Sequence, residues 1–323
     1  DGELVVADEL VDIRFPEDFK AWVPYVKARI KEGGLERYYF NSFENTYTVQ
    51  PLSEVADNHL AFVPLLVDAG CAKIAITEAD LEQYPGMYLY NPTHGTALRG
   101  NFAPYPSKEV QGGHNELQLM VTEREDFIAR TQGTRAFPWR IFVIAGNDIE
   151  LADNDMVYRL ASPSRVEDTS WIRPGKVAWE WWNACGLKGV DFEAGINNAT
   201  YKAYIDFAAK YGIEYILLDD GWSERGKADL MRVVPEIDLR ELVDYGRERG
   251  VGILLWAGYK AFDRDMERVC AHYAAMGIKG FKIDYMDHDD QTIVDFHYRA
   301  AETAARHRLV LDFHGTYKPT GLN

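Results

Sequence analysis

Residues 280–291 read Gly-Phe-Lys-Ile-Asp-Tyr-Met-Asp-His-Asp-Asp-Gln, an apolar run that ends in charged side chains. Side chains of a strand alternate between its two faces, so Lys282 and Asp284 are expected on one face and Ile283 on the other. A lysine two residues before a carboxylate suits a nucleophile held beside a cation that binds substrate. At the rim of a barrel of parallel strands, this pair predicts chemistry on a polyol.

Five short and nearly continuous apolar runs mark the second half of the chain. Such runs are typical of strands in a parallel sheet that is covered on both faces. We expect these strands at residues 177–183, 213–219, 252–257, 280–284 and 309–313. Charged and aromatic residues end most of them, and no glycine-rich phosphate loop is present. A (β/α)8 TIM-type barrel is therefore favoured over a doubly wound sheet.

Helical patterns lie between these runs. Asn198 and Asp238 are expected to cap two helices, Gly277 to end a third, and Asp289 to cap the helix after the fourth strand. A complete eight-stranded barrel takes about 250 residues. The chain after residue 172 is too short for that, so we expect only the first five strands of the barrel.

The first half of the chain has a different sequence pattern, in which short strand-like runs alternate with Pro, Gly and Asn clusters. Strands are expected at residues 35–40, 60–67, 72–77, 117–121 and 139–144, and one helix at 19–32. This pattern predicts a β-sandwich over residues 1–172, a domain that can begin upstream of Asp1. The truncated barrel is then expected over residues 173–323.

Charge and cysteine usage exclude several classes of function. The formal net charge of −16 disfavours binding to nucleic acid or to an anionic membrane, because both would repel the protein. Cys71, Cys185 and Cys270 show neither zinc spacing nor a disulfide framework. No apolar run approaches the length of a membrane span. A start at Asp1 is compatible with a signal peptide that has been removed.

The end of the second strand carries two adjacent acids and a tryptophan. Asp219 and Asp220 can accept hydrogen bonds from neighbouring sugar hydroxyls, and Trp222 can offer a flat face to a sugar ring. An acidic turn that caps the next helix is the alternative for this motif. A buried pair with a structural role is the alternative for Lys282 and Asp284.

Aromatic residues at other strand ends extend the candidate site. Trp182 lies in the motif Trp-Glu-Trp-Trp that ends the first strand, and Trp256 ends the third. Burial in the core is the alternative for both tryptophans. His314, after the fifth strand, is a weaker candidate for binding substrate. Residues 287–290 could ligate a metal, although helix capping is the preferred interpretation.

Taken in order along both predicted domains, several motifs resemble those of glycoside hydrolase family 97. They are residues 41–44 (Asn-Ser-Phe-Glu), 77–81, 133–140, 219–222 and 282–284. The family comprises bacterial exo-acting α-glycosidases with an N-terminal β-sandwich on a (β/α)8 barrel. The resemblance covers essentially the whole chain and therefore implies glycoside hydrolysis by this fold.

The resemblance also implies a mechanism. The inverting branch of the family has glycine where Asp284 stands and a catalytic glutamate where Gly315 stands, so this chain resembles the retaining branch. Asp284 would then be the nucleophile, and a second carboxyl about 5–5.5 Å away would act as acid and base. In the family that glutamate lies on the segment after the fifth strand, beyond Asn323. The chain as given is therefore expected to be inactive.

Further properties follow from the family alone. It binds one calcium ion near the catalytic acid, and Glu44 matches the ligand contributed by the sandwich, although calcium needs about six to eight oxygen ligands. The motifs at residues 219–222 and 282–284 resemble those whose acids and lysine bind galactose in clan D α-galactosidases. This resemblance favours an α-galactoside over an α-glucoside as substrate. A non-catalytic carbohydrate-binding protein is the alternative if the natural chain lacks the acid. The family resemblance implies that the protein is periplasmic or secreted.

Overall fold

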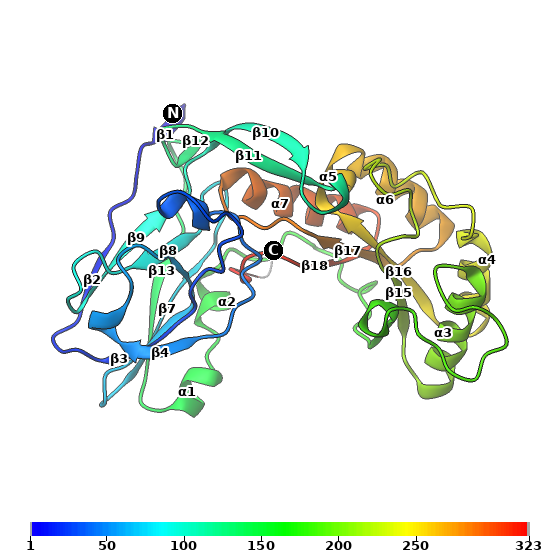
Figure 1. Ribbon diagram of the computed structural model, residues 1–323, viewed down its shortest axis with the longest axis horizontal. Coiled ribbons are helices and arrows are strands. Elements are labelled where there is room, and N and C mark those ends of the chain that lie inside the picture. Colours follow the sequence, from blue (N-terminus) through cyan, green and yellow to red (C-terminus); the bar gives the residue numbers. More distant parts are fainter. Residues whose placement is uncertain (1, 322–323) are drawn as a thin grey trace.

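The computed structural model describes residues 2–321 and shows two lobes (Figure 1). The N-terminal lobe contains four antiparallel sheets, and the C-terminal lobe is built on one parallel sheet. None of the helices in residues 2–321 combines the length and the apolar character that a bilayer crossing requires.

Two sheets face each other across the core of the N-terminal lobe. One has the strand order β13–β7–β6–β3–β4 and the other has the order β2–β9–β8–β5. Leu65 and Val67 of the first sheet and Leu89 of the second are fully buried in one shared apolar cluster. This packing is β-sandwich-like. The strands are β2 (Asp12–Arg14), β3 (Lys20–Val23), β4 (Thr48–Pro51), β5 (Ala61–Phe62), β6 (Leu65–Asp68), β7 (Lys73–Ala79), β8 (Met87–Tyr90), β9 (Ala97–Phe102) and β13 (Trp139–Ala145).

Two smaller sheets and several short helices complete this lobe. Strands β1 (Glu3–Val6) and β12 (Ala129–Gln132) form one pair, and β10 (Pro106–Gly112) and β11 (Gln118–Arg124) form a hairpin. The hairpin extends from the N-terminal lobe to helix α5 (Tyr259–Arg264) of the other lobe (Figure 1). The helices are η1 (Leu35–Tyr38), η2 (Leu52–Glu54), η3 (His114–Glu116), α1 (Asp148–Ala152) and α2 (Met156–Leu160).

Two of the expected elements in this lobe are wrong. The helix expected at residues 19–32 is replaced by β3, which lies between β4 and β6. Pro24 explains the difference, since a proline inside a helix removes a hydrogen bond and clashes with the preceding turn. The strand expected at residues 35–40 is the 3₁₀ helix η1. Tyr38 and Tyr39 are both buried there, a pattern that an alternating strand could not give.

The C-terminal lobe contains a five-stranded parallel sheet with the order β14–β15–β16–β17–β18. Strands follow one another in chain order, without the reversal of a doubly wound sheet. Within the described residues the sheet is open and does not close into a barrel. The strands are β14 (Val177–Trp179), β15 (Tyr215–Leu218), β16 (Gly252–Gly258), β17 (Gly280–Asp284) and β18 (Val310–Phe313). The helices are η4 (Glu180–Asn183), α3 (Asn198–Tyr211), α4 (Leu239–Glu248), α5 (Tyr259–Arg264), α6 (Met266–Met276) and α7 (Gln291–Arg306).

Helix ends follow the sequence signals with two corrections. Asp238 caps α4 by accepting from the backbone of Glu241, and Gly277 ends α6 with a φ of +110°. Asn197, one residue before the expected Asn198, caps α3. Asp290, and not Asp289, occupies the N-cap position of α7, because Asp289 is buried against the N-terminal lobe.

Candidate active site

The carboxyl ends of the parallel strands open onto a pocket of about 270 Å³ that is lined by both charged and aromatic residues. Parallel strands present these ends at one edge, so residues distant in the chain converge there. Both lobes supply its walls. The lining residues are Arg29, Ser42, Glu44, His114, Trp179, Trp181, Asp219, Asp220, Trp256, Lys282, Asp284, Tyr285, Asp287, His314 and Gly315.

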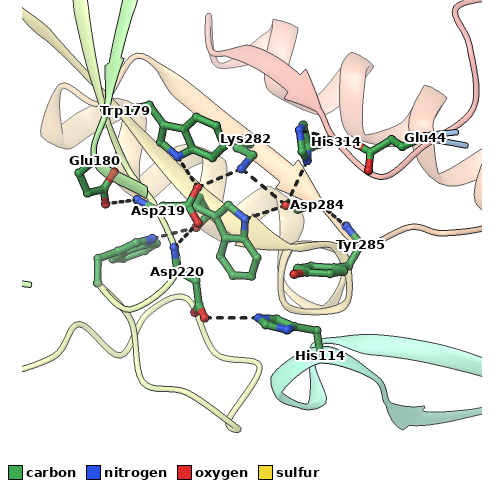
Figure 2. Close-up of polar contacts among 12 residues, drawn as sticks. Glu44, His114, Trp179, Glu180, Asp219, Asp220, Lys282, Asp284, Tyr285 and His314 are labelled. Carbon is green, nitrogen blue, oxygen red and sulfur yellow. Dashed lines mark hydrogen bonds and ion pairs between the residues drawn. The ribbon is translucent and has the colours of Figure 1, made fainter. Parts of the chain in front are cut away.

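Asp284, the last residue of β17, is held on both carboxylate oxygens. Its Oδ1 accepts from the backbone N–H of Tyr285 at 2.7 Å, and its Oδ2 accepts from the indole of Trp256 at 3.1 Å. Lys282 Nζ lies 3.6 Å and His314 Nδ1 lies 3.5 Å from Oδ2 (Figure 2). Burial raises the pKa of Asp284, but the contact with His314 and the charge of Lys282 outweigh it and hold the pKa below 3.8. This carboxyl is therefore ionised at neutral pH.

Lys282 connects Asp284 with a second buried acid. Its Nζ donates to Asp219 Oδ2 at 2.9 Å and lies 4.2 Å from the centre of the Trp179 ring. The indole of Trp179 donates to the same carboxylate oxygen at 2.6 Å. Lys282 and Asp219 are each 4% exposed, so their charges face each other with little screening by water. The arrangement fixes one ammonium group between two carboxylates at the floor of the pocket.

Glu180 lies behind this group and supports it. Its Oε1 accepts from the backbone N–H of Asp219 at 2.7 Å and from the hydroxyl of Tyr201 at 2.9 Å. Its Oε2 is buried and has no hydrogen-bond partner in the described residues. Burial raises the pKa of Glu180 to about 7. Glu180 was missed in the sequence, although its place in a strand-end motif carried the same signal as Asp219.

Asp220, Trp256 and His314 all line the pocket, whereas two of the expected tryptophans do not. Trp222 is fully buried in the core of the C-terminal lobe, where its indole donates to the backbone carbonyl of Trp256 at 2.8 Å. The expectation that Trp222 offers a face to sugar is therefore wrong. The glycine before it has a φ of +124°, and the chain turns there so that the indole enters the core.

The tryptophans after β14 also differ from the expectation. Trp179 and Trp181 line the pocket, with ring centroids 6.1 Å apart. Trp182 is 81% exposed and does not reach the pocket lining, because η4 turns the chain immediately after β14. The sequence motif thus indicated the correct strand end but the wrong tryptophan.

The N-terminal lobe closes one side of the pocket, and of its lining residues only Glu44 was expected at the site. Arg29 Nη1 lies 2.6 Å from Oδ2 of Asp287. Gln118 donates to the same oxygen at 2.7 Å. The backbone N–H of Asn41 donates to the carbonyl of Asp287 at 2.6 Å. The segment after β17, expected to be a helix-capping or metal-binding loop, is therefore buried between the lobes.

Glu44 lies at the mouth of the pocket, with its Oε1 3.9 Å from His314 Nε2 (Figure 2). Its side chain is 59% exposed. Residues 2–321 contain no group of three or more His, Cys, Asp or Glu side chains that could hold a metal ion.

The fold and the pocket define a two-lobed protein with a carboxylate-rich, aromatic pocket at the end of a parallel β/α sheet. Two family models together match most of the chain, Glycosyl-hydrolase 97 N-terminal over residues 1–163 and Glycoside hydrolase 97 over residues 179–323. The chain belongs to glycoside hydrolase family 97, as its motifs suggested.

Two curated relatives and one solved structure show how far the similarity extends. A protein named "Retaining alpha-galactosidase" from Bacteroides thetaiotaomicron is 57% identical over 319 residues, which are 98% of this chain and 48% of the relative. A "Probable retaining alpha-galactosidase" from Streptomyces bingchenggensis is 34% identical over 259 residues, 74% of this chain and 39% of that relative. This chain therefore spans less than half the length of either relative.

The solved structure supports the fold. It is a glycoside hydrolase family 97 enzyme in complex with acarbose from Pseudoalteromonas sp. strain K8. The TM-score is 0.79 and the sequence identity is 21%, over 98% of this chain and 48% of that chain. At this level of identity, the similarity concerns the arrangement of the two lobes.

Proposed function

We propose that this chain is part of a retaining, exo-acting α-galactosidase, in which Asp284 is the nucleophile. The observation that carries the proposal is the carboxylate of Asp284, held beside Lys282 and His314 at the floor of a pocket of about 270 Å³. The 57% identity to a protein named retaining alpha-galactosidase supports it.

The surroundings of Asp284 suit covalent catalysis. One carboxylate oxygen attacks the anomeric carbon, the glycosidic bond breaks, and the leaving oxygen takes a proton from a general acid. Water then cleaves the glycosyl–aspartate bond, so that the sugar leaves with its original anomeric configuration. Gly315 leaves space for this geometry, because a Cβ at that position would lie 3.1 Å from Asp284 Oδ1. A larger residue there would crowd the nucleophile.

We propose that the general acid is supplied by sequence beyond Asn323. Asp287 is an alternative among the lining residues, and its burial raises its pKa, as an acid requires. However, Oδ2 of Asp287 is held by Arg29 and Gln118, and the side chain is only 1% exposed. These contacts support a role for Asp287 in joining the lobes.

The remaining pocket residues are proposed to bind the sugar. Lys282 and Asp220 line the cavity and can donate to and accept from ring hydroxyls, while Asp219 holds Lys282 in place. Trp181, which is 60% exposed, offers apolar surface of the kind that sugar rings stack on. Trp256 is only 2% exposed, as its core alternative expected, and its indole supports Asp284 instead. This set suits a polyhydroxylated ring and explains why the pocket combines charge with aromatic side chains.

Several properties of the whole protein belong to the same proposal. We infer that the parallel sheet continues into a closed (β/α)8 barrel and that Glu44 supplies one ligand of a calcium ion completed by residues outside this chain. No step of the reaction is assigned to that ion. We also propose a periplasmic or secreted protein whose partners are α-linked oligosaccharides, and the charge of −16 supports the exclusion of nucleic acid and anionic membrane.

The decisive experiment uses the full-length natural protein. A 5-fluoro-galactosyl fluoride inactivator should label Asp284, as seen by peptide mass spectrometry. Proton NMR of the first product from an aryl α-galactoside should show the α-anomer. Label on another carboxylate, or a β-anomer formed first, would contradict the assignment. Comparison with the matching aryl α-glucoside tests the preference for galactose.

A further inference from the structure

The hairpin β10–β11 ends in a short segment, residues 113–117, which we call the hairpin tip. It connects the two strands at the end of the hairpin that approaches the C-terminal lobe (Figure 1). Asn115 and Glu116 have φ values of +48° and +62°. Non-glycine residues rarely adopt this conformation, so two in succession indicate that surrounding contacts hold the backbone.

These contacts anchor the tip to the C-terminal lobe. Leu117 is 6% exposed and belongs to the apolar core that fills that lobe. The amide of Gln118 donates to the carbonyl of Tyr285 at 2.9 Å, and its Oε1 accepts from the backbone N–H of His114 at 2.8 Å. The tip is therefore tied to the segment that immediately follows Asp284.

The tip also contacts a residue that lines the sugar pocket. Asn115 Nδ2 donates to Asp220 Oδ2 at 2.8 Å, and His114 Nε2 lies 3.6 Å from the same oxygen. Arg225 Nε is 3.5 Å from it as well. Within residues 2–321, every side-chain contact to this carboxylate goes to Oδ2, which leaves Oδ1 available to accept a hydrogen bond from a sugar hydroxyl.

His114 forms a wall of the pocket through stacking. Its ring lies parallel to that of Tyr285, with centroids 4.4 Å apart and an interplanar angle of 13° (Figure 2). Both residues line the pocket, and Tyr285 follows the proposed nucleophile directly. One hairpin of the N-terminal lobe thus touches both Asp220 and the residue next to Asp284.

We propose that the hairpin tip is a specificity element of the sugar pocket and that Asn115 is a positioning residue that fixes the carboxylate of Asp220. This inference rests on the proposed function and names the residue through which the N-terminal lobe contributes to the choice of substrate. A carboxylate held in one orientation accepts from hydroxyls over a limited range of directions. A sugar without a hydroxyl there leaves Oδ1 desolvated and without a hydrogen-bond donor, so it is bound less well.

The alternative role for the tip is purely structural, as a contact that joins the lobes. Two variants separate these roles without straining the backbone. Glycine and aspartate both tolerate positive φ, so Asn115→Gly removes the donor and Asn115→Asp places a like charge beside Asp220. Glu123→Gln, at an exposed ion pair with Lys108 on the same hairpin, is the matched control.

The experiment measures kcat and KM for an aryl α-galactoside with the full-length protein. Asn115→Gly is expected to lower kcat/KM about ten- to a hundredfold, which is the usual effect of a lost hydrogen bond to a charged group. Asn115→Asp is expected to lower kcat/KM further, because it places a like charge beside Asp220. In an Asp220→Ala background, Asn115→Gly is expected to change kcat/KM less than twofold, because its partner is gone. Glu123→Gln should behave as the unaltered protein, and all single variants should keep its Tm within a few degrees.

Other results would overturn the proposal. An equal loss for Asn115→Gly in both backgrounds would show that Asn115 acts independently of Asp220, and no loss would remove it from the site. Galactose affinity, measured by calorimetry on the same variants, gives a readout that does not need turnover. An unaltered protein that neither hydrolyses the galactoside nor binds galactose would overturn the proposed function together with this inference.

Discussion

His314 Nδ1 lies 3.5 Å from Oδ2 of Asp284, so the end of β18 places a titratable ring beside the carboxylate at the end of β17. The backbone N–H of His314 donates to the carbonyl of Ile283 at 2.8 Å, which continues the pairing of the two strands. The contact raises the pKa of His314 above 6.5, and it helps to hold the pKa of Asp284 below 3.8 despite burial. The two residues thus stabilise each other's charged forms.

Substitution of His314 should shift the pH dependence of catalysis. In a full-length His314→Gln variant, the pKa of Asp284 loses a stabilising partner and should rise. The acidic limb of the kcat/KM profile, which reports the ionisation of the nucleophile in the free enzyme, should therefore move to higher pH. The same profile for His94→Gln, an exposed histidine of the N-terminal lobe, should not move. An unchanged acidic limb in His314→Gln would show that the pair does not control Asp284.

Removal of the charge of Asp284 should abolish turnover. Asp284→Asn keeps the shape of the side chain but cannot form the glycosyl–enzyme bond. We expect kcat for an aryl α-galactoside to fall by several orders of magnitude in the full-length protein, while the folded structure, followed by circular dichroism, is retained. Near-normal rates would assign the nucleophile to another residue.

Alanine substitution should affect stability at Trp222 and substrate binding at Trp181. Trp222 is fully buried, so Trp222→Ala should lower the free energy of unfolding by about 3–5 kcal/mol. Trp181 is 60% exposed and lines the pocket, so Trp181→Ala should leave Tm almost unchanged and raise KM for an aryl α-galactoside several-fold. Thermal melts and steady-state kinetics on both variants test this. A stable Trp222→Ala protein with a raised KM would reverse the assignment.

Stability should depend on pH through Asp289, which is buried where the lobes meet and accepts from the hydroxyl of Tyr88 at 2.7 Å. Burial raises its pKa to about 7, from 3.8. Between pH 4 and pH 7 the folded protein therefore holds a proton that the unfolded chain has released. The free energy of unfolding falls as pH rises through this window.

The variant Asp289→Asn should remove this contribution. Its unfolding free energy, measured by denaturant titration, should decrease less between pH 4 and pH 7 than that of the unaltered protein. Asp244→Asn, an exposed substitution on α4, serves as the control. If the unfolding free energy of both variants falls with pH as steeply as that of the unaltered protein, Asp289 does not carry the proton.

Calcium binding can be tested through Glu44. In the full-length protein, Glu44→Gln should weaken calcium affinity about tenfold, because a neutral amide replaces one charged oxygen ligand. Calorimetry after chelation and dialysis measures the affinity, with the exposed Glu54→Gln as the control. A full-length protein that binds no calcium, or an unchanged affinity in Glu44→Gln, would exclude Glu44 as a ligand.

Local sequence by itself determined the parallel strands and what lies at their ends. Residues 280–284 form β17 as expected, with Lys282 and Asp284 on one face, because the alternation of a strand depends only on neighbouring residues. Asp238 begins α4 and Gly277 ends α6 for equally local reasons. The family resemblance rested on the same short motifs and is confirmed.

The tertiary structure alone decided which side chains meet. Trp222 enters the core and Trp181 the pocket, although both follow strands in similar motifs, because the backbone turns after β15 and β14 differ. Asn115 reaches Asp220 across 105 residues, and no local pattern marks such a pairing. Contacts between the lobes depend on how the surface of the N-terminal lobe packs against that of the C-terminal lobe. For this reason the part of the pocket wall that Arg29 and His114 of the N-terminal lobe provide could be seen only in the folded molecule, whereas Glu44 was expected there.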